Sequence, residues 1–221
     1  MTNKDLTFIA GIIDRSGSMA HIADDTAGGW NTLVAEQAKQ PGQCQVMLTE
    51  FDSICEIVHE LVDAKDAPSY FLRARGNTAL RDAIGKTVTE LGQKLAALPE
   101  DERPATVIVP ILTDGHENAS EEWSAKDVKA LIEQQTEVYG WIFQFMGANQ
   151  DAILTAKGIG IRSAHAVTYD THNVGSAYAS TSSNIARSRS MAATGASAEA
   201  VSDCATYTDD QRSAAIVTPH A

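Results

Sequence analysis

The stretch LTFIAGIIDRSGS, residues 6–18, indicates the fold and shows a polar group where a strand should end. Residues 6–13 form an apolar run, which is typical of a β-strand that is buried on both faces of a sheet. The run stops at a carboxylate, Asp14, and two hydroxyls follow at alternate positions, Ser16 and Ser18. The stretch therefore predicts a buried strand of an α/β sheet, with an acid and two small oxygen donors at its carboxyl end.

Further apolar runs alternate with helical spacing along the chain. Buried strands are expected at 105–114 and 141–148, and a weaker strand at 164–169. Segments 43–51 and 54–61, joined by a short connection, predict an antiparallel hairpin. Helices are expected at 22–39, 78–98, 120–138 and 149–158. We therefore expect an α/β, Rossmann-like fold: a doubly wound, mostly parallel central sheet with one antiparallel edge strand and helices on both faces.

Two of the expected helices carry more specific predictions. In the helix at 22–39, Gly28 and Gly29 are costly, so we expect another element to pass close to the backbone there. In the helix at 120–138, the spacing of the apolar residues predicts that four of them point inward. These four residues are Val128, Leu131, Ile132 and Val138.

The composition changes after about residue 170, where alanine, serine and threonine dominate and large apolar residues become scarce. We therefore expect a folded domain at residues 1–170 and a C-terminal segment at residues 171–221 that is part helix and part flexible tail. Within this segment, Val174 to Met191 is expected to form a helix that docks on the domain. Residues 192–221 are expected to be flexible or to fold only on a partner.

The chain is acidic, and this narrows the classes of partner. It has 17 basic and 29 acidic residues among 221, a net charge of −12. Because an acidic surface repels phosphate backbones and anionic lipids, we expect no nucleic acid and no membrane as partner, and we expect cations or basic groups to be attracted. The three cysteines lack a CxxC spacing, which predicts free thiols in a reducing compartment. No signal peptide or membrane span is apparent, so a cytoplasmic protein is expected.

Five side chains offer hard oxygen atoms where strands end or a helix begins. In open α/β sheets, ligands bind at the carboxyl ends of the strands, so we expect these oxygens to meet there. The five residues are Asp14, Ser16, Ser18, Thr78 and Asp114. Two carboxylates and three hydroxyls suit Mg²⁺ and also Mn²⁺. Zinc prefers nitrogen and sulfur ligands, and Ca²⁺ fits less well because the donors are few for its larger shell.

Three motifs, in order along the chain, resemble those of one family. DRSGS at 14–18 matches the DxSxS motif of von Willebrand factor A-like domains, and GNTALRDAI at 76–84 and ILTDGHEN at 111–118 resemble the segments that complete their metal-ion-dependent adhesion site. The resemblance covers about residues 5–170. Within this superfamily, the sequence is similar to small stand-alone bacterial and phage members. It implies that the five residues hold a divalent cation, and that an Asp or Glu of a protein partner completes the coordination.

Three functions from different classes follow. The first is a metal-dependent protein-binding module that captures a partner carboxylate. The second is a Mg²⁺-dependent phosphotransferase or hydrolase, because a strand-terminal Asp superficially resembles the haloacid dehalogenase type. Those enzymes carry a second acid two residues on, where Ser16 stands here, and no GxxxxGK[ST] or GxSxG motif is present, so we expect no enzyme. The third is a structural component of a phage particle or multi-protein assembly.

Other polar residues near the expected site leave two interpretations each. His21 and His116 could act as bases or contact a partner, or could be ordinary surface groups. Asp52, Asp82 and Glu117 could shape the negative field around the ion, or could be solvated acids of loops.

Overall fold

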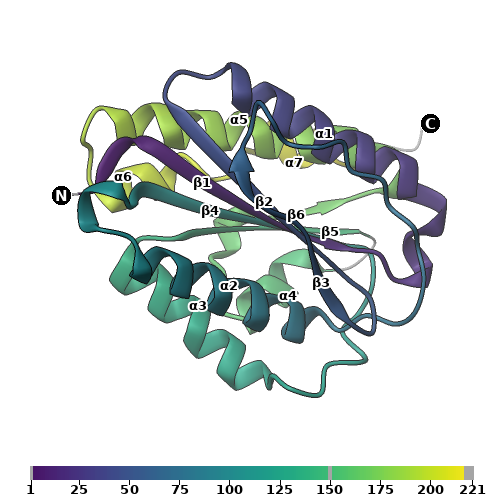
Figure 1. The fold of residues 1–221 in the computed structure, drawn as a ribbon. Helices are drawn as coiled ribbons and strands as arrows, with labels where there is room; N and C mark the ends of the chain where they lie inside the picture. The colour runs from purple at the N-terminus through teal and green to yellow at the C-terminus, as the bar shows by residue number, and fades with distance from the viewer. Residues whose placement is uncertain (1, 149–150, 217–221) are drawn as a thin grey trace.

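The computed structural model describes residues 2–148 and 151–216, which fold around a six-stranded sheet with the strand order β3-β2-β1-β4-β5-β6 (Figure 1). The strands are β1 (Asn3–Asp14), β2 (Gln43–Phe51), β3 (Cys55–Asp63), β4 (Pro104–Thr113), β5 (Ile142–Ala148) and β6 (Ala166–Tyr169). All neighbouring strands pair in parallel except β2 and β3, which form the antiparallel edge. The predicted fold class is confirmed.

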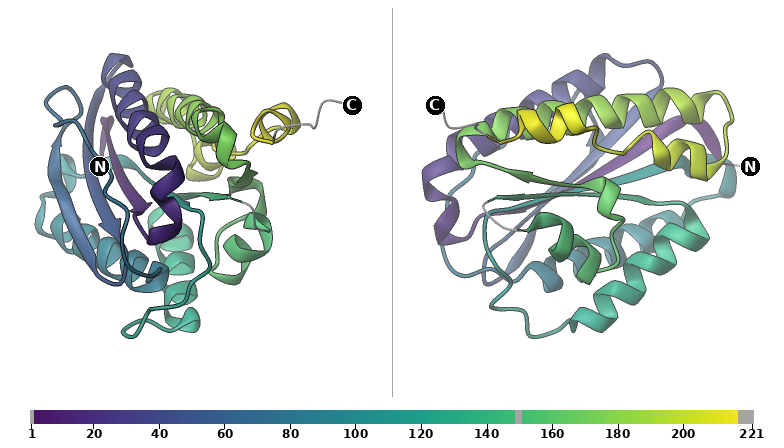
Figure 2. Two further views of the ribbon diagram at one scale, coloured as in Figure 1. Left: turned by 90° about the vertical axis from the view of Figure 1, so that its right-hand side faces the viewer. Right: turned by 180° about the vertical axis from the view of Figure 1, so that it is seen from behind.

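Helices cover both faces of this sheet (Figures 1 and 2). They are α1 (Ala23–Lys39), α2 (Leu80–Ala97), α3 (Ala125–Tyr139), α4 (Ala152–Gly158), α5 (Val174–Ala193), α6 (Ala198–Asp203) and α7 (Asp209–Ala214), with short 3-10 turns at Gly17–Ile22, Glu100–Glu102, Ser163–His165 and Thr171–Asn173. The first face carries α1, α5, α6 and α7, and the opposite face carries α2, α3 and α4. None of the helices in residues 2–148 and 151–216 has the length and apolar character needed to cross a bilayer.

Helix α3 shows how local sequence sets an element and its inward face. Ser124 begins it, because its side chain accepts a hydrogen bond from the backbone of Asp127, and Gly140 ends it in the left-handed conformation at φ 69°. Ile132 is buried, but Val138 is 66% exposed, so its predicted inward position is wrong. At 3.6 residues per turn, a residue six positions further along points away from the core.

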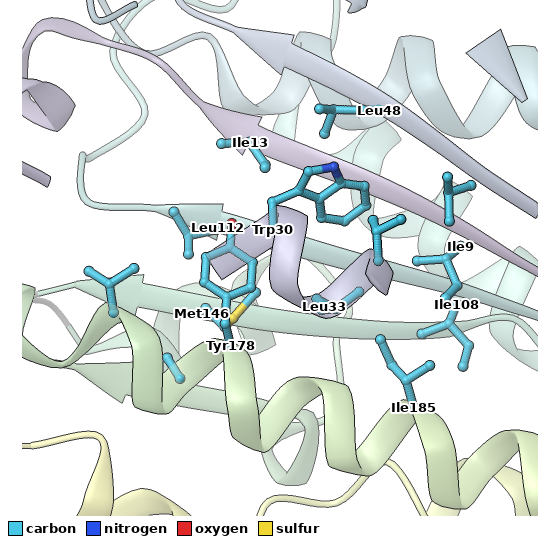
Figure 3. Packing of buried hydrophobic residues seen from close by; sticks show 14 of the residues in the cluster. Ile9, Ile13, Trp30, Leu33, Leu48, Ile108, Leu112, Met146, Tyr178 and Ile185 are labelled. Carbon is cyan, nitrogen blue, oxygen red and sulfur yellow. The ribbon is translucent and has the colours of Figure 1, made fainter. Parts of the chain in front are cut away.

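Trp30 of α1 and Tyr178 of α5 fill the first face (Figure 3). A Cβ atom on Gly11 of β1 would lie 2.5 Å from the Trp30 ring, and one on Gly29 would lie 2.2 Å from the Tyr178 ring. The predicted close approach is confirmed at Gly29, where α5 crosses α1. It is wrong at Gly28, where nothing lies within 4 Å.

The C-terminal segment is more ordered than its composition indicates. The predicted helix from 174 is confirmed as α5, which packs on the sheet beside α1. Residues 198–214, expected to be flexible, form α6 and α7, and Tyr207 between them is buried with its hydroxyl 2.7 Å from that of Thr181. A capping box from Thr208 to Gln211 begins α7. The expected flexibility at 217–221 lies outside the described residues, and the division at residue 170 stays a prediction.

The predicted free thiols are confirmed at Cys44, Cys55 and Cys204, whereas the reducing compartment stays a prediction. Burial raises the pKa of the Cys44 thiol to about 11, so it stays protonated and unreactive at neutral pH.

Candidate metal centre

The candidate centre lies between the ends of β1 and β4. These strands are parallel neighbours, with Ile13 beside Leu112, so Asp14 and Asp114 follow at the same edge of the sheet. Helix α1 continues from β1 on one face and α3 follows β4 on the other. A parallel sheet opens a crevice where successive connections leave on opposite faces. The two predicted aspartates therefore lie at the crevice of this fold.

A chain of hydrogen bonds connects four of the five predicted residues. The backbone N–H of Ser16 donates to Oδ1 of Asp14 at 2.7 Å. The hydroxyls of Ser16 and Ser18 are 3.1 Å apart. The Ser18 hydroxyl donates to Oδ1 of Asp114 at 2.5 Å, which joins the loop after β1 to the loop after β4. Residues 96 positions apart in the chain thus meet through their oxygen atoms.

Thr78, the fifth predicted residue, joins them from the start of α2. Its backbone N–H donates to the side chain of Asn118 at 3.0 Å, and its carbonyl accepts from the backbone of Asn118 and Ala119. A Cβ atom on Gly115 would lie 2.8 Å from the Thr78 hydroxyl and 3.5 Å from Oδ2 of Asp14. The Thr78 hydroxyl and the Asp14 carboxylate therefore both lie beside Gly115, where any side chain would come into contact with them.

Thr113, the last residue of β4, belongs to the same group and was not predicted. Its hydroxyl donates to Oδ2 of Asp14 at 2.6 Å. The same hydroxyl accepts from the backbone N–H of Gly115 at 3.1 Å and lies 3.2 Å from the carbonyl oxygen of Gly115. Thr113 is fully buried at the end of an apolar strand, where a hydroxyl needs a partner. That position was the sequence feature that could have identified it.

Asp14 is poorly compensated by the protein around it. It is fully buried, and burial raises the pKa of its carboxyl from 3.8 to about 6, even though hydrogen bonds from Thr113 and Ser16 act in the opposite direction. The charge of Asp114 raises the pKa further. Among the described residues, no salt bridge connects Asp14 to a cationic side chain. A bound cation would favour the ionised form.

Arg15, the residue after Asp14, turns its side chain away from the centre. It is buried and pairs with Asp52 at 2.8 Å, and also with Glu50 and Glu56. Arg75 adds a second guanidinium, 2.7 Å from Asp52 and 3.2 Å from Glu56. Burial opposes ionisation of Asp52, but the hydrogen bonds from Arg75, the Ile54 backbone and Arg15, together with the charge of Arg15, outweigh it and lower the pKa of Asp52. Asp52 is therefore held by arginines.

The remaining polar candidates mostly hold loops together. Asp82 accepts hydrogen bonds from consecutive backbone N–H groups before α3. Glu117 accepts from the loop that follows it, which lowers its pKa although its partial burial acts in the opposite direction. Nδ1 of His21 lies 2.7 Å from the carbonyl of Ser18, and His116 is exposed. Glu117 is thus a loop acid, whereas Asp82 lies in the first turn of α2 and holds the loop before α3.

The oxygen set suits a hard cation. It contains two carboxylates and three hydroxyls from separate segments, and no nitrogen or sulfur donor, which matches Mg²⁺ or Mn²⁺. The part of the chain that the structure describes contains no group of three or more His, Cys, Asp and Glu side chains able to hold a metal. Hydroxyl oxygens would therefore have to contribute directly or through water. The buried, uncompensated Asp14 carboxylate is the feature that fits a cation best.

No protein-family model and no curated protein matches the chain. Several solved structures share its fold at low identity. They include the von Willebrand factor domain of the type V pili tip protein Mfa5 from Porphyromonas gingivalis (11% identity, TM-score 0.57, 84% of this chain and 95% of that one). A von Willebrand factor type A protein from Catenulispora acidiphila is 18% identical, with TM-score 0.54, over 85% of this chain and 42% of that one.

Proximal thread matrix protein 1 from the mussel byssus, with a zinc-occupied MIDAS motif, is 15% identical, with TM-score 0.57, over 78% of this chain and 46% of that one. The chain thus spans less than half of the length of the Catenulispora and mussel chains. At these identities the likeness concerns the fold alone. The chain has a von Willebrand factor A-like fold.

Proposed function

We propose that the chain is a metal-dependent protein-binding module that captures a carboxylate of a protein partner through a divalent cation. The cation is Mg²⁺ or Mn²⁺, held by Asp14, Ser16, Ser18, Thr78 and Asp114. One observation carries the proposal: the oxygen atoms of three distant segments converge beside the buried carboxylate of Asp14, whose raised pKa indicates that its charge lacks compensation. When bound, the ion supplies the positive charge that holds the partner.

The exposure of the five residues gives the direction of approach. Asp14 and Ser16 are buried, whereas Ser18 is exposed and Asp114 is half-buried. A partner would therefore reach the ion from the side of Ser18 and Asp114. Mg²⁺ takes six oxygen ligands and the five residues supply five, so a carboxylate oxygen from the partner can complete the coordination.

The names of structurally similar proteins support binding over catalysis. They include a pilus adhesin, SpaC from Lactobacillus rhamnosus GG, as well as the pilus tip and byssus matrix proteins. In this chain, the position two residues after Asp14 holds Ser16, which cannot serve as the second acid of a phosphoryl-transfer site. We propose no turnover.

Calorimetric titration of the purified protein with Mg²⁺ and Mn²⁺ tests the metal site. We expect one binding event in the wild type and loss of that event in Asp14→Ala and Thr78→Ala. Asp25→Asn is the matched control, because Asp25 is an exposed acid of α1 outside the centre. Equal metal binding by wild type and Asp14→Ala, with both proteins folded by circular dichroism, would contradict the proposal.

Affinity capture tests the partner. Protein captured by the wild type in Mg²⁺ should be lost with chelator and with Asp14→Ala, and retained by Asp25→Asn. Capture that survives both chelator and Asp14→Ala would show that another surface binds the partner.

A further inference from the structure

The connection between β3 and α2 leads directly into the candidate centre. Residues 67–79 form neither helix nor strand and run beside α1 to the end of the molecule where β1 and β4 end (Figure 1). Asn31 of α1 holds the connection by two hydrogen bonds to the backbone of Tyr70, at 2.8 and 2.9 Å. Thr78, the residue of the centre, lies at the other end. The connection is therefore fixed to α1 at one end and to the metal centre at the other.

Near the centre, backbone hydrogen bonds join the connection to the loop after β1. The N–H of Arg75 donates to the carbonyl of Arg15 at 2.7 Å. The N–H of Gly17 donates to the carbonyl of Gly76 at 3.1 Å. The segment between Tyr70 and Arg75 is thus anchored on both sides.

The anchored segment alternates like an extended strand. Tyr70 and Leu72 are buried, and Phe71, Arg73 and Arg75 point outward. Phe71 is 78% exposed, the highest exposure among the large apolar residues in the described ranges. One aromatic ring and the guanidinium of Arg73 therefore form an outward strip on a chain with a net charge of −12, next to Arg75, which is partly exposed but pairs with Asp52 and Glu56.

Two properties make this strip suited to a partner. In the described part of the chain, Arg73 makes no hydrogen bond or ion pair, and no hydrogen bond reaches the backbone N–H or C=O groups of residues 71–74. An anchored extended segment with free backbone groups can pair with an extended peptide. Aromatic and arginine side chains are also the types that most often dominate binding energy at protein interfaces.

We propose that residues 71–75 are a docking strip for an extended, acidic segment of the partner whose carboxylate binds the cation. This inference rests on the proposed function. An acid of the segment pairs with Arg73 and an apolar side chain covers Phe71, while the metal-binding Asp or Glu reaches the ion beside Thr78. Because the chain carries a net charge of −12, the protein as a whole repels an acidic segment, and this favours binding where Arg73 is exposed.

The length of the strip limits the spacing of the two acids. From Arg73 to Thr78 the chain spans at most roughly 17 Å if fully extended. The acid that pairs with Arg73 and the acid that binds the ion should therefore be separated by no more than about five residues of extended partner chain.

A displayed random peptide library, selected on the wild-type protein in Mg²⁺, tests the proposal. We expect the selected peptides to contain two acidic residues within this spacing and an apolar residue. Synthetic versions of these peptides should bind Arg73→Glu and Phe71→Ser at least about tenfold more weakly than wild type. Lys126→Glu, an equal charge change on an exposed residue of α3, should bind them as wild type does.

The outcomes separate this inference from the proposed function. Peptides that require Mg²⁺ and Asp14 but bind Arg73→Glu and Phe71→Ser with wild-type affinity would overturn the docking strip and leave the metal site standing. Peptides that bind equally well in chelator and to Asp14→Ala would contradict the proposed function, and with it the combined site. Selection of basic or neutral peptides, or of none, would also overturn the docking strip. Both substituted side chains are exposed, so unchanged thermal unfolding confirms that the variants are folded.

Discussion

Replacing Asp14 by asparagine separates two effects of its buried charge: the loss of folding stability without metal, and the binding of Mg²⁺. Burial raises the pKa of the Asp14 carboxyl from 3.8 to about 6. At 1.36 kcal/mol per pKa unit, this difference corresponds to about 3 kcal/mol of folding stability in the metal-free protein. Asparagine has nearly the same shape, and its amide oxygen can still accept the N–H of Ser16. The hydroxyl of Thr113 can turn to the carbonyl of Gly115, 3.2 Å away.

The sign follows from the direction of the shift. Because the pKa of Asp14 is higher in the folded protein than in the unfolded chain, the folded state binds more protons between the two values. The contribution of Asp14 to folding stability is therefore fully present below about pH 4, where its carboxyl is protonated, and is lost as the pH rises through about 6. In chelator, Asp14→Asn should match the wild type at about pH 4 and exceed its stability by up to about 3 kcal/mol at about pH 8.

Urea unfolding in chelator and in Mg²⁺ measures both effects. At a concentration a hundredfold above its dissociation constant, Mg²⁺ should stabilise the wild type by about 2.7 kcal/mol and leave Asp14→Asn unchanged. Asp25→Asn, the exposed control on α1, should behave as wild type in both conditions. The reasoning is refuted if Asp14→Asn is less stable than wild type in chelator at about pH 8 and gains as much from Mg²⁺.

Four further substitutions have defined outcomes. Gly115→Ala places a Cβ atom 2.8 Å from the Thr78 hydroxyl. Mg²⁺ affinity should therefore fall at least about tenfold in calorimetry while circular dichroism stays unchanged. Gly29→Ala forces its Cβ atom to 2.2 Å from the Tyr178 ring and should cost about 1–3 kcal/mol in urea unfolding, whereas Gly28→Ala, in open space, should stabilise α1 by up to about 1 kcal/mol. Arg15→Met leaves the buried carboxylate of Glu50 without a cationic partner, although Arg75 still pairs with Asp52 and Glu56, and should cost about 3–5 kcal/mol at neutral pH, less in acid, by the same measurement.

The sequence was sufficient to predict that the side chains of the site lie near one another, because each occupies a position that a local pattern defines. Asp14 and Asp114 follow apolar runs, and Thr78 precedes a helix with a clear period. Parallel strands bring such positions to one edge of the sheet, so no long-range information was needed to bring them together. The position of Thr113 is equally local. Its hydrogen bond to Asp14, however, depends on the register between β4 and β1, which the sequence does not show.

The C-terminal segment is more ordered than predicted, because a scarcity of large apolar residues does not exclude a packed core. Alanine, serine and glycine allow α5 to approach α1 closely, and the burial is then carried by a few large rings. Tyr178 fills the space above Gly29, and Tyr207 anchors the stretch between α6 and α7. An aromatic side chain buries as much area as several alanines, so composition alone underestimates such packing.

The contrast between Asp14 and Arg15 explains why the Asp14 carboxylate lacks a cationic partner in the protein. The guanidinium of Arg15 is next to Asp14 in the chain and could have neutralised it. Successive side chains at the end of a strand point to opposite sides, and Arg15 is directed to the carboxylates that β2 and β3 supply. Its own charge is thereby compensated inside the protein, and the loop is fixed to β2 through the bond from its N–H to the Phe51 carbonyl. One loop thus holds a closed ion-pair network on one side and leaves on the other a buried carboxylate that pairs with no cationic side chain of the described residues.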